Sequence, residues 1–219
     1  MNPETVSIAV FARAPEPGAA KTRLIPALGA QGAARLHRQL TLRAVRTARE
    51  AGLGPVTLWC APDSQHRFFR ALRRCTGVAC QAQPAGDLGQ RMLDAFRWHC
   101  AQGPLLLIGT DCPALAAGDL HAAAQALSED SDAVFLPAED GGYVLIGLRR
   151  PQPSLFAGIA WGAESVMDET RARLRAAGAT WREPRTLWDV DRPADLQRLA
   201  ALWRDEARQS PLSTIQGGV

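Results

Sequence analysis

Short runs rich in leucine and β-branched residues alternate along this chain with longer segments in which alanine, leucine and arginine recur with a helical period. This alternation is typical of an α/β sheet whose strands are connected by helices. The predicted strands cover residues 6–12, 56–60, 78–81, 105–108, 133–136, 143–148 and 180–183. The predicted helices cover residues 32–51, 64–74, 88–100, 120–127, 164–176 and 194–207.

The length and hydrophobic content predict a single domain. A chain of 219 residues, of which 47% are hydrophobic, can bury one substantial core. We expect that domain to span residues 1–208 and the Ser-, Pro- and Gly-containing segment 209–219 to form a loose tail. The oligomeric state stays open, with a homodimer as one option.

Charge and cysteine content limit the partners and the compartment. The net charge of +3 is spread along the chain, which favours small anionic ligands over nucleic acid. The five cysteines are an odd number and contain no CxxC pair, as expected for reduced thiols in the cytoplasm. The sequence shows no basic leader with a long apolar run behind it and no run of transmembrane length, so we expect a soluble cytoplasmic protein that does not bind membranes.

The only lysine of the chain, Lys21, lies in a Gly/Pro loop directly after the first predicted strand. The loop also carries Gly18, Thr22 and Arg23. A strand that leads into such a loop is a recurrent way to hold phosphate, because backbone N–H groups and fixed positive charge meet the anion together. The alternative is that arginine has replaced lysine elsewhere and Lys21 is a chance survivor on the surface.

Two acidic motifs follow predicted strands, where ligands of open α/β sheets bind. Asp111 comes after the aliphatic strand 105–108 and is a candidate ligand of a hard cation; its alternative role is to cap the next helix. Asp140, Gly141, Gly142 and Tyr143 separate two predicted strands. Paired glycines allow a ligand to approach closely. Taken alone, however, this segment favours an ordinary hairpin turn.

A third acidic motif, Trp188-Asp189-Val190-Asp191-Arg192-Pro193, precedes the last predicted helix. If the segment is extended, Asp189 and Asp191 share a face. One or both of them could meet Asp111 and complete an oxygen-ligand site for Mg²⁺ or Mn²⁺. The competing role for Asp191 is to cap the helix that begins near Pro193.

Two further loops are candidates for substrate contacts. Gly86, Asp87 and Arg91 lie in a Gly-containing loop that runs into a helix, and could cradle a nucleobase or ribose. A plain strand-to-helix loop is equally consistent with that pattern. Trp161, in the loop 156–165, could position an acceptor or could anchor the core.

Several enzyme templates do not fit. A Walker A loop requires glycine where this chain has Pro15 and Ala20, so the Gly18 to Thr22 segment matches only its last residues. The four histidines form no HExxH pair and no G-x-S-x-G motif is present, which argues against zinc and triad hydrolases.

Taken in order, the motifs resemble those of a bacterial family of short GT-A-type proteins described as nucleotide-diphospho-sugar transferases, or as glycosyltransferases of arsenosugar-type clusters. The motifs are Pro-Glu-Pro-Gly-x-x-Lys-Thr-Arg-Leu, Gly-Asp-Leu-Gly-x-Arg-Met, Gly-Thr-Asp-x-Pro-x-Leu, Asp-Gly-Gly-Tyr and Asp-Val-Asp-x-Pro-x-Asp-Leu. A more distant similarity links the chain to sugar-phosphate, molybdopterin and phospholactate nucleotidyltransferases. The resemblance implies a three-layer, Rossmann-like GT-A fold with a mostly parallel mixed sheet.

The resemblance also implies a chemistry, which is transfer from a nucleoside triphosphate or a sugar nucleotide to a small-molecule acceptor. In nucleotidyl transfer to an anionic acceptor, Lys21 and Arg23, with Arg13, would hold phosphates. Asp111 and Asp191 would bind the divalent cation, and the acceptor would enter near Tyr143 and Trp161. In glycosyl transfer, Asp140 or Glu139 becomes a candidate base for the acceptor hydroxyl. A catalytically silent, nucleotide-binding scaffold is the third option.

Overall fold

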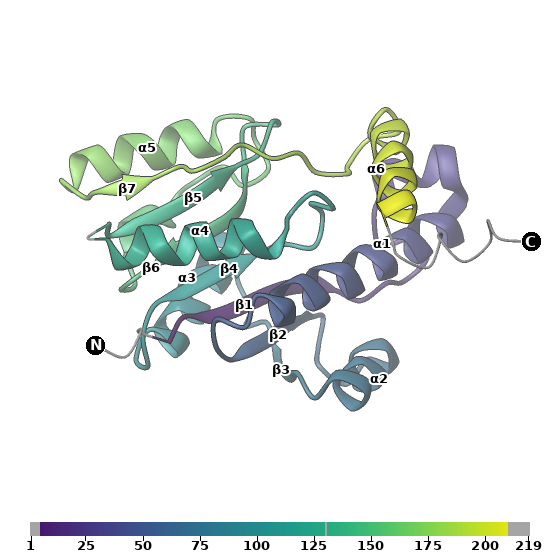
Figure 1. The fold of residues 1–219 in the computed structure, drawn as a ribbon, viewed down its shortest axis with the longest axis horizontal. Coiled ribbons are helices and arrows are strands. Elements are labelled where there is room, and N and C mark those ends of the chain that lie inside the picture. Colours follow the sequence, from purple (N-terminus) through teal and green to yellow (C-terminus); the bar gives the residue numbers. More distant parts are fainter. Residues whose placement is uncertain (1–4, 130, 210–219) are drawn as a thin grey trace, which may run out of the picture.

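The computed structural model describes residues 5–129 and 131–209 and contains one seven-stranded mixed sheet (Figure 1). The strand order is β3-β2-β1-β4-β6-β5-β7, and β6 alone runs against the others. The strands are β1 (Ser7–Arg13), β2 (Val56–Ala61), β3 (Ala79–Ala82), β4 (Leu105–Ile108), β5 (Ala133–Pro137), β6 (Tyr143–Leu148) and β7 (Trp181–Arg182). The prediction of a mostly parallel mixed sheet is confirmed.

Six α-helices accompany the sheet in the described part of the chain. They are α1 (Ile25–Glu50), α2 (Arg67–Thr76), α3 (Leu88–His99), α4 (Ala117–Ser128), α5 (Val166–Ala176) and α6 (Asp195–Gln209). Short 3₁₀ turns, η1 and η2, cover Thr22–Leu24 and Pro153–Leu155. None of the helices in residues 5–129 and 131–209 combines the length and the apolar character needed to cross a bilayer.

The side chains of β1 alternate between two apolar cores, which gives the molecule its three layers. Ile8 and Val10 pack into the core under α1, α2 and α4, whereas Ala9 and Phe11 pack into the core under α3 and α5. This period of two is the direct consequence of strand geometry. Both faces of the central strands are therefore covered, which explains why they are almost uniformly apolar.

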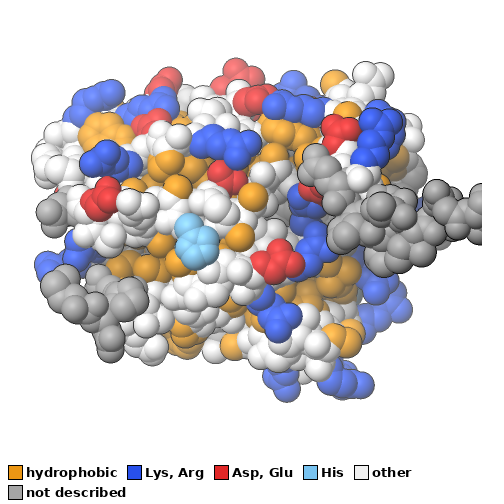
Figure 2. All heavy atoms as spheres, viewed as in Figure 1, with side chains coloured by type: hydrophobic (Ala, Val, Ile, Leu, Met, Phe, Trp, Pro, Cys, Tyr) orange, Lys and Arg blue, Asp and Glu red, His pale blue; other side chains and the backbone are white. Residues whose placement is uncertain are grey.

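A third, smaller core joins the two ends of the described chain. Leu24 and Leu36 from the region of η1 and α1 pack with Trp188, Val190 and Leu199. Figure 1 shows α6 beside the first turns of α1, far along the sequence but close in space. On the face drawn in Figure 2, basic and acidic side chains are interspersed rather than massed in one patch.

The element boundaries differ from the sequence prediction mainly at helix starts. Helix α1 begins at Ile25 rather than at residue 32, with an irregular residue, Gly29, at φ 67° inside it. Helix α4 begins at Ala117, since the Asp119 carboxylate accepts the Ala116 N–H at 2.9 Å. Helix α6 continues to Gln209, so the predicted tail loses its first residue, and residues 210–219 lie outside the described residues.

Candidate active site

A cleft of about 700 Å³ opens at the carboxyl ends of β1, β2 and β4. Because β6 is antiparallel to β4, its first residues reach the same edge. Ligands of open α/β sheets bind at this edge. Four basic and four acidic side chains line the cleft: Arg13, Lys21, Arg23, Arg91, Asp111, Asp140, Asp189 and Asp191.

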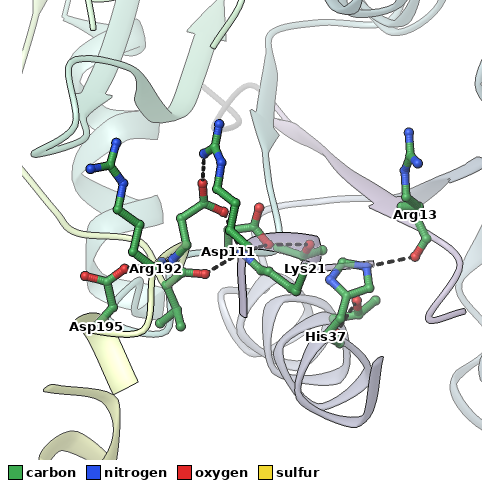
Figure 3. A network of polar contacts seen from close by, with 11 residues as sticks. Arg13, Lys21, His37, Asp111, Arg192 and Asp195 are labelled. Carbon is green, nitrogen blue, oxygen red and sulfur yellow. Dashed lines mark hydrogen bonds and ion pairs between the residues drawn. The ribbon is translucent and has the colours of Figure 1, made fainter. Parts of the chain in front are cut away.

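Lys21 ties three segments of the cleft together (Figure 3). Its Nζ lies 2.9 Å from Oδ1 of Asp111 and 3.3 Å from Oδ1 of Asp191, and it also donates to the Val190 carbonyl. The Lys21 side chain is only 3% exposed, against 46% for Asp111 and 31% for Asp191. Lys21, placed among phosphate ligands by the sequence, is thus the counter-ion of the two carboxylates predicted to bind metal.

Asp191 is held from both sides. One carboxylate oxygen faces Lys21 and the other accepts from Arg23. Burial alone would raise the pKa of Asp191, but these two cations outweigh it and the pKa is lowered. The alternative role of Asp191 as a helix cap is wrong, because Asp195 accepts the N–H groups of Asp191 and Arg192 at 2.9 and 2.7 Å.

Arg13 ends β1 at the rim of the cleft, and His37 on α1 fixes its backbone. The Nε2 atom of His37 lies 2.9 Å from the Arg13 carbonyl oxygen. Burial lowers the pKa of His37, so the ring is neutral at pH 7 and donates through Nε2. Figure 3 shows the Arg13 guanidinium turned away from this contact, with no dashed line to another residue drawn. Among the residues drawn there, no carboxylate pairs with this cation.

Asp189 adds a further acidic group. It lines the cleft, and burial, together with the nearby charges of Asp140 and Asp191, raises its pKa to about 6. Val190, between the two aspartates, is fully buried in the third core. The Val190 N–H donates to the Asp111 carbonyl oxygen at 2.9 Å, which holds this segment against the end of β4.

The donor set suits a hard divalent cation that is shared with substrate. Within the described residues, no three or more His, Cys, Asp or Glu side chains gather into a metal-binding cluster. Mg²⁺ commonly needs only one or two carboxylates when substrate phosphates and waters supply the other oxygens. Asp111 and Asp191, bridged by one ammonium group, fit that pattern.

The Asp140 segment forms a tight hairpin between β5 and β6, as its sequence favoured. The Asp140 carboxylate accepts the Gly142 N–H at 3.0 Å, and Asp140 and Gly142 both line the cleft. Gly141 instead faces Glu164, just before α5. At φ 89°, a Cβ on Gly141 would stand 1.9 Å from the Glu164 carbonyl oxygen.

A smaller chamber of about 180 Å³ opens from the cleft beside this hairpin. Tyr143 and Trp161 line it, with their rings perpendicular and their centroids 6.4 Å apart. Trp161 also packs on the core under α3 and α5, which agrees with its alternative role as a core anchor. The hydroxyl of Tyr143 is buried with no partner among the described residues.

Of the other residues predicted to contact the nucleotide, some line the cleft and others do not. Arg91 lines the cleft and donates to the Gly86 carbonyl at 2.8 Å. Asp87 is the N-cap of α3, where its carboxylate accepts the Gln90 N–H at 2.8 Å. Neither Gly86 nor Asp87 is among the residues lining the cleft, and in the first loop Thr22 lines it whereas Gly18 does not.

Sequence reasoning missed His37, Gln83 and Asp195. Gln83 lines the cleft and donates to the Trp59 carbonyl at 2.9 Å. Nothing in the sequence singles out His37 or Gln83, because each contacts backbone of a distant segment. Asp195 could have been found from the sequence, because it lies at the start of the last predicted helix. Acidic side chains at that position commonly accept backbone N–H groups.

The fold and cleft together define a protein of the nucleotide-diphospho-sugar transferase fold, an architecture of transferase enzymes, and comparison with known proteins supports this class. The chain belongs to the family described as "Uncharacterized protein conserved in bacteria (DUF2064)", whose profile matches residues 42–163, more than half of the chain. No curated protein sequence matches this chain. The resemblance noted in the sequence is confirmed at the level of the fold.

Solved structures resemble this chain over nearly its full length. A candidate nucleotide-diphospho-sugar transferase from Desulfovibrio desulfuricans G20 is 26% identical with a TM-score of 0.79, covering 92% of this chain and 98% of its own. CMP:2-keto-3-deoxy-manno-octonic acid synthetase in complex with CTP is 15% identical with a TM-score of 0.59, covering 92% and 99%. The 4-diphosphocytidyl-2C-methyl-D-erythritol synthase from Anaerococcus prevotii DSM 20548 is 8% identical with a TM-score of 0.61, covering 93% and 100%. The last two establish shared fold only.

Proposed function

We propose that this protein is a divalent-metal-dependent transferase that moves the nucleotidyl group of a nucleoside triphosphate to a small anionic acceptor. The observation that carries the proposal is the meeting of Lys21, Asp111 and Asp191 at the carboxyl edge of the sheet. Three segments far apart in sequence converge there on one cluster of charge. The named activities of the similar structures agree with this class.

The charge of the cleft supports a requirement for a cation. Its four acidic and four basic side chains cancel formally. A triphosphate adds several negative charges, which a neutral cleft cannot offset without a further cation. Mg²⁺ or Mn²⁺ held by Asp111 and Asp191 would neutralise charge on the phosphates and on the departing pyrophosphate.

The residues of the chain divide the remaining work. Arg13 and Arg23 are exposed at the cleft and supply fixed positive charge for phosphate oxygens. The Lys21 ammonium keeps the two carboxylates together in the absence of substrate. If Asp111 and Asp191 held a metal ion, the Lys21 ammonium would be left to compensate charge on the phosphates. Phosphoryl and nucleotidyl transfer require mainly such alignment and charge compensation.

A binding screen tests the proposal first. The four common nucleoside triphosphates are titrated into the protein with and without Mg²⁺ or Mn²⁺, and thermal unfolding is followed. A ligand specific to the native state stabilises it by about 2.7 kcal/mol at a hundredfold excess over the dissociation constant. We expect a metal-dependent shift for one triphosphate that is reduced in Arg23→Gln and kept in Glu50→Gln, an exposed acidic residue on α1 that is absent from the cleft lining.

Product analysis then tests the reaction. With the bound triphosphate and a panel of phosphorylated and carboxylated acceptors, pyrophosphate release that depends on acceptor supports nucleotidyl transfer. Binding without turnover across the panel would instead support a nucleotide-binding scaffold. If no triphosphate binds at all, the proposal fails.

Glycosyl transfer is the second candidate, favoured by the sugar-nucleotide description of the D. desulfuricans protein. The same cleft would then hold the diphosphate of a sugar nucleotide. Asp140, exposed at the junction of the cleft and the chamber, is placed to act as base for an acceptor hydroxyl. Release of a nucleoside diphosphate, rather than pyrophosphate, would identify this reaction.

A further inference from the structure

Helix α2 carries four arginines and no acidic residue in its ten positions. It lies beside β3 at one edge of the sheet (Figure 1). Its buried face consists of Phe68, Phe69 and Leu72. Arg70, Arg73 and Arg74 are exposed, and their spacing of three and four residues places them together on another face of the helix.

These three arginines line a small pocket together with Ser64 and Gln65, which belong to the segment between β2 and α2. The pocket has a volume of about 170 Å³, several times the roughly 30 Å³ that one water molecule takes up in the liquid. No carboxylate of the described residues lines it, and none of its five lining residues lines the cleft. The pocket therefore gathers three positive charges and two neutral polar side chains away from the candidate active site.

The arginines of this pocket lack the partners that helical arginines have elsewhere in the chain. On α1, α3 and α5, arginines pair with acidic side chains three or four positions away: Arg46 with Glu50, Arg97 with Asp94, Arg171 with Asp168 and Arg173 with Glu169. Within residues 5–129 and 131–209, the side chains of Arg70, Arg73 and Arg74 form no ion pair and no hydrogen bond. Arg70 and Arg74 instead repel each other across one helical turn.

The acidic residue next to the pocket in sequence does not offset this charge. The Asp63 Oδ1 atom accepts the N–H groups of Gln65 and His66 at 2.6 and 3.1 Å, and Asp63 does not line the pocket. The described chain thus leaves the charge of the pocket uncompensated, and a bound anion would compensate it.

We propose that this pocket binds the phosphoryl group of a small phosphorylated molecule. A phosphomonoester offers three terminal oxygens and nearly two negative charges, whereas a carboxylate offers two oxygens and one charge. Three guanidinium groups match the phosphomonoester better, since each can donate paired hydrogen bonds to its oxygens. The Ser64 hydroxyl and the Gln65 amide add neutral donors. The inference goes beyond the proposed function and does not depend on it, because the pocket and the cleft share no lining residue.

The arrangement favours a single phosphoryl group over a nucleic acid. A nucleic acid requires a track of positive charge that follows several phosphates. Here the positive charge of the pocket comes from two turns of one helix, and the Asp63 carboxylate follows directly on its N-terminal side.

A titration with inorganic phosphate, followed by ¹⁵N NMR at pH 8 and constant ionic strength, tests the proposal. The backbone N–H signals of Ser64 and Gln65 report on the pocket, and the signal of Thr22 reports on the cleft. We expect phosphate to shift the two pocket signals along a saturable curve and acetate, a planar monoanion, to bind there several-fold more weakly. Shifts that do not saturate, or equal affinities for acetate and phosphate, would overturn the proposal.

Three variants of α2 separate a pocket from the general charge of the helix. Arg70→Gln and Arg74→Gln each remove a charged donor from the pocket and should weaken phosphate binding by roughly fivefold or more. Arg67→Gln removes the same charge from an exposed position of the same helix that does not line the pocket, and should change the affinity by less than about twofold. Urea unfolding should show no loss of stability, because each substitution relieves repulsion among exposed arginines. Equal losses of affinity in all three variants would overturn the pocket assignment.

Two further ligands identify the source of the phosphoryl group. We expect glycerol phosphate to bind as inorganic phosphate does, with the same dependence on Arg70 and Arg74. A short single-stranded oligonucleotide that binds more tightly, and that all three variants weaken equally, would identify a nucleic-acid surface and overturn the proposal.

The outcomes also separate this inference from the proposed function. Saturable shifts at Ser64 and Gln65 without any binding of triphosphate would support the pocket and remove the transferase proposal. Binding of triphosphate in the cleft without a saturable phosphate shift at the pocket would do the reverse.

Discussion

The Lys21 ammonium lies 2.9 Å from Asp111 Oδ1, so the loop after β1 and the end of β4 are joined by a buried cation. Lys21 has backbone angles in the left-handed region, at φ 50°, which is uncommon for residues other than glycine. The same ammonium reaches Asp191 at 3.3 Å. A single side chain thereby fixes the distance between the two proposed metal ligands.

Replacing Lys21 by methionine should have opposite effects on stability and on metal binding. The unfolding free energy should fall by about 1–3 kcal/mol, because Asp111 loses its counter-ion and Asp191 keeps only Arg23. The affinity for Mn²⁺ in the absence of nucleotide should rise, because no ammonium competes for Asp111 and Asp191. Urea unfolding and calorimetric titration measure the two effects, with Lys21→Arg as the charge-preserving control. Weaker or unchanged Mn²⁺ binding in the methionine variant would contradict the inference that the Lys21 ammonium occupies the position of a metal ion between Asp111 and Asp191.

Asp111→Asn and Asp191→Asn should each lower the turnover number by at least about 100-fold, since each would remove charge that holds the proposed cation. The turnover number is measured at saturating nucleotide and metal, with the acceptor found in the panel. Glu50→Gln should retain full turnover. Urea unfolding of each variant shows whether a loss reflects the fold instead. Near-normal turnover in either asparagine variant would exclude that residue as a metal ligand.

Asp195 should contribute both to stability and to the position of Asp191. Its carboxylate accepts two backbone N–H groups, so Asp195→Ala should cost about 1 kcal/mol of unfolding free energy. Asp195→Asn keeps an accepting oxygen and should lose less. Urea unfolding compares the two, and nucleotide titration should follow the same order. Equal losses in both variants would mean that the negative charge, not the hydrogen bonding, matters.

Two glycines with similar backbone angles should respond very differently to alanine. Gly18, at φ 84°, has no atom within 4 Å of the position that a Cβ would take, whereas at Gly141 the added atom would overlap the Glu164 carbonyl. Gly18→Ala should cost about 1 kcal/mol from backbone strain alone. Gly141→Ala should cost clearly more, because the hairpin must move away from α5. Denaturant unfolding that gave similar losses for the two would refute this close packing.

His99 should lower the stability of the fold as the pH falls from 6.5 to 4, while Asp189, whose pKa is raised to about 6, acts in the opposite direction over the same window. Burial lowers the pKa of His99 to about 4, and its Nε2 accepts the Trp59 indole N–H at 3.3 Å. In the unfolded chain the pKa of His99 is near 6.5, so in this window the unfolded state binds a proton there that the folded state does not. The contribution of His99 is complete above pH 6.5 and is lost as the pH falls, by about 3 kcal/mol at most.

His99→Gln should flatten that dependence while keeping an accepting atom for Trp59. The measurement is the unfolding free energy at several pH values from 4 to 7.5. His37, whose pKa burial also lowers, leaves a residual slope in the variant. An unchanged slope would show that His99 titrates normally in the folded protein.

Much of the sheet could be predicted because the sequence pattern of each strand is local to that strand. The four aliphatic residues of β4 and the β-branched and apolar run of β1 are unambiguous. Strand β7, which has only two residues, was overestimated at both ends, because its pairing depends on β5. The start of α1 was missed because Pro26 and Gly29 interrupt the helical pattern, while packing of Leu24 and Leu36 on Trp188 and Val190 sets its position.

The sequence singled out several residues that line the cleft, but it did not predict which of them form ion pairs with one another. Lys21 and Asp111 each follow a predicted strand and Asp191 lies in an acidic motif that could meet Asp111, so a common place at the carboxyl edge of the sheet could be expected. That Lys21 pairs with both carboxylates depends on how three distant segments pack, which no local pattern encodes. For the same reason the N-cap role of Asp87 was visible only from its contact with the Gln90 N–H.

Asp189 and Asp191 lie beyond the last residue of β7, so the complete sheet precedes them in the chain. During synthesis, all seven strands leave the ribosome before the second carboxylate of the site does. A chain that stops after Arg182 would hold every strand and still leave the Lys21 ammonium with only Asp111 of its three partners. The proposed substrate site is therefore completed only after the whole sheet has been made.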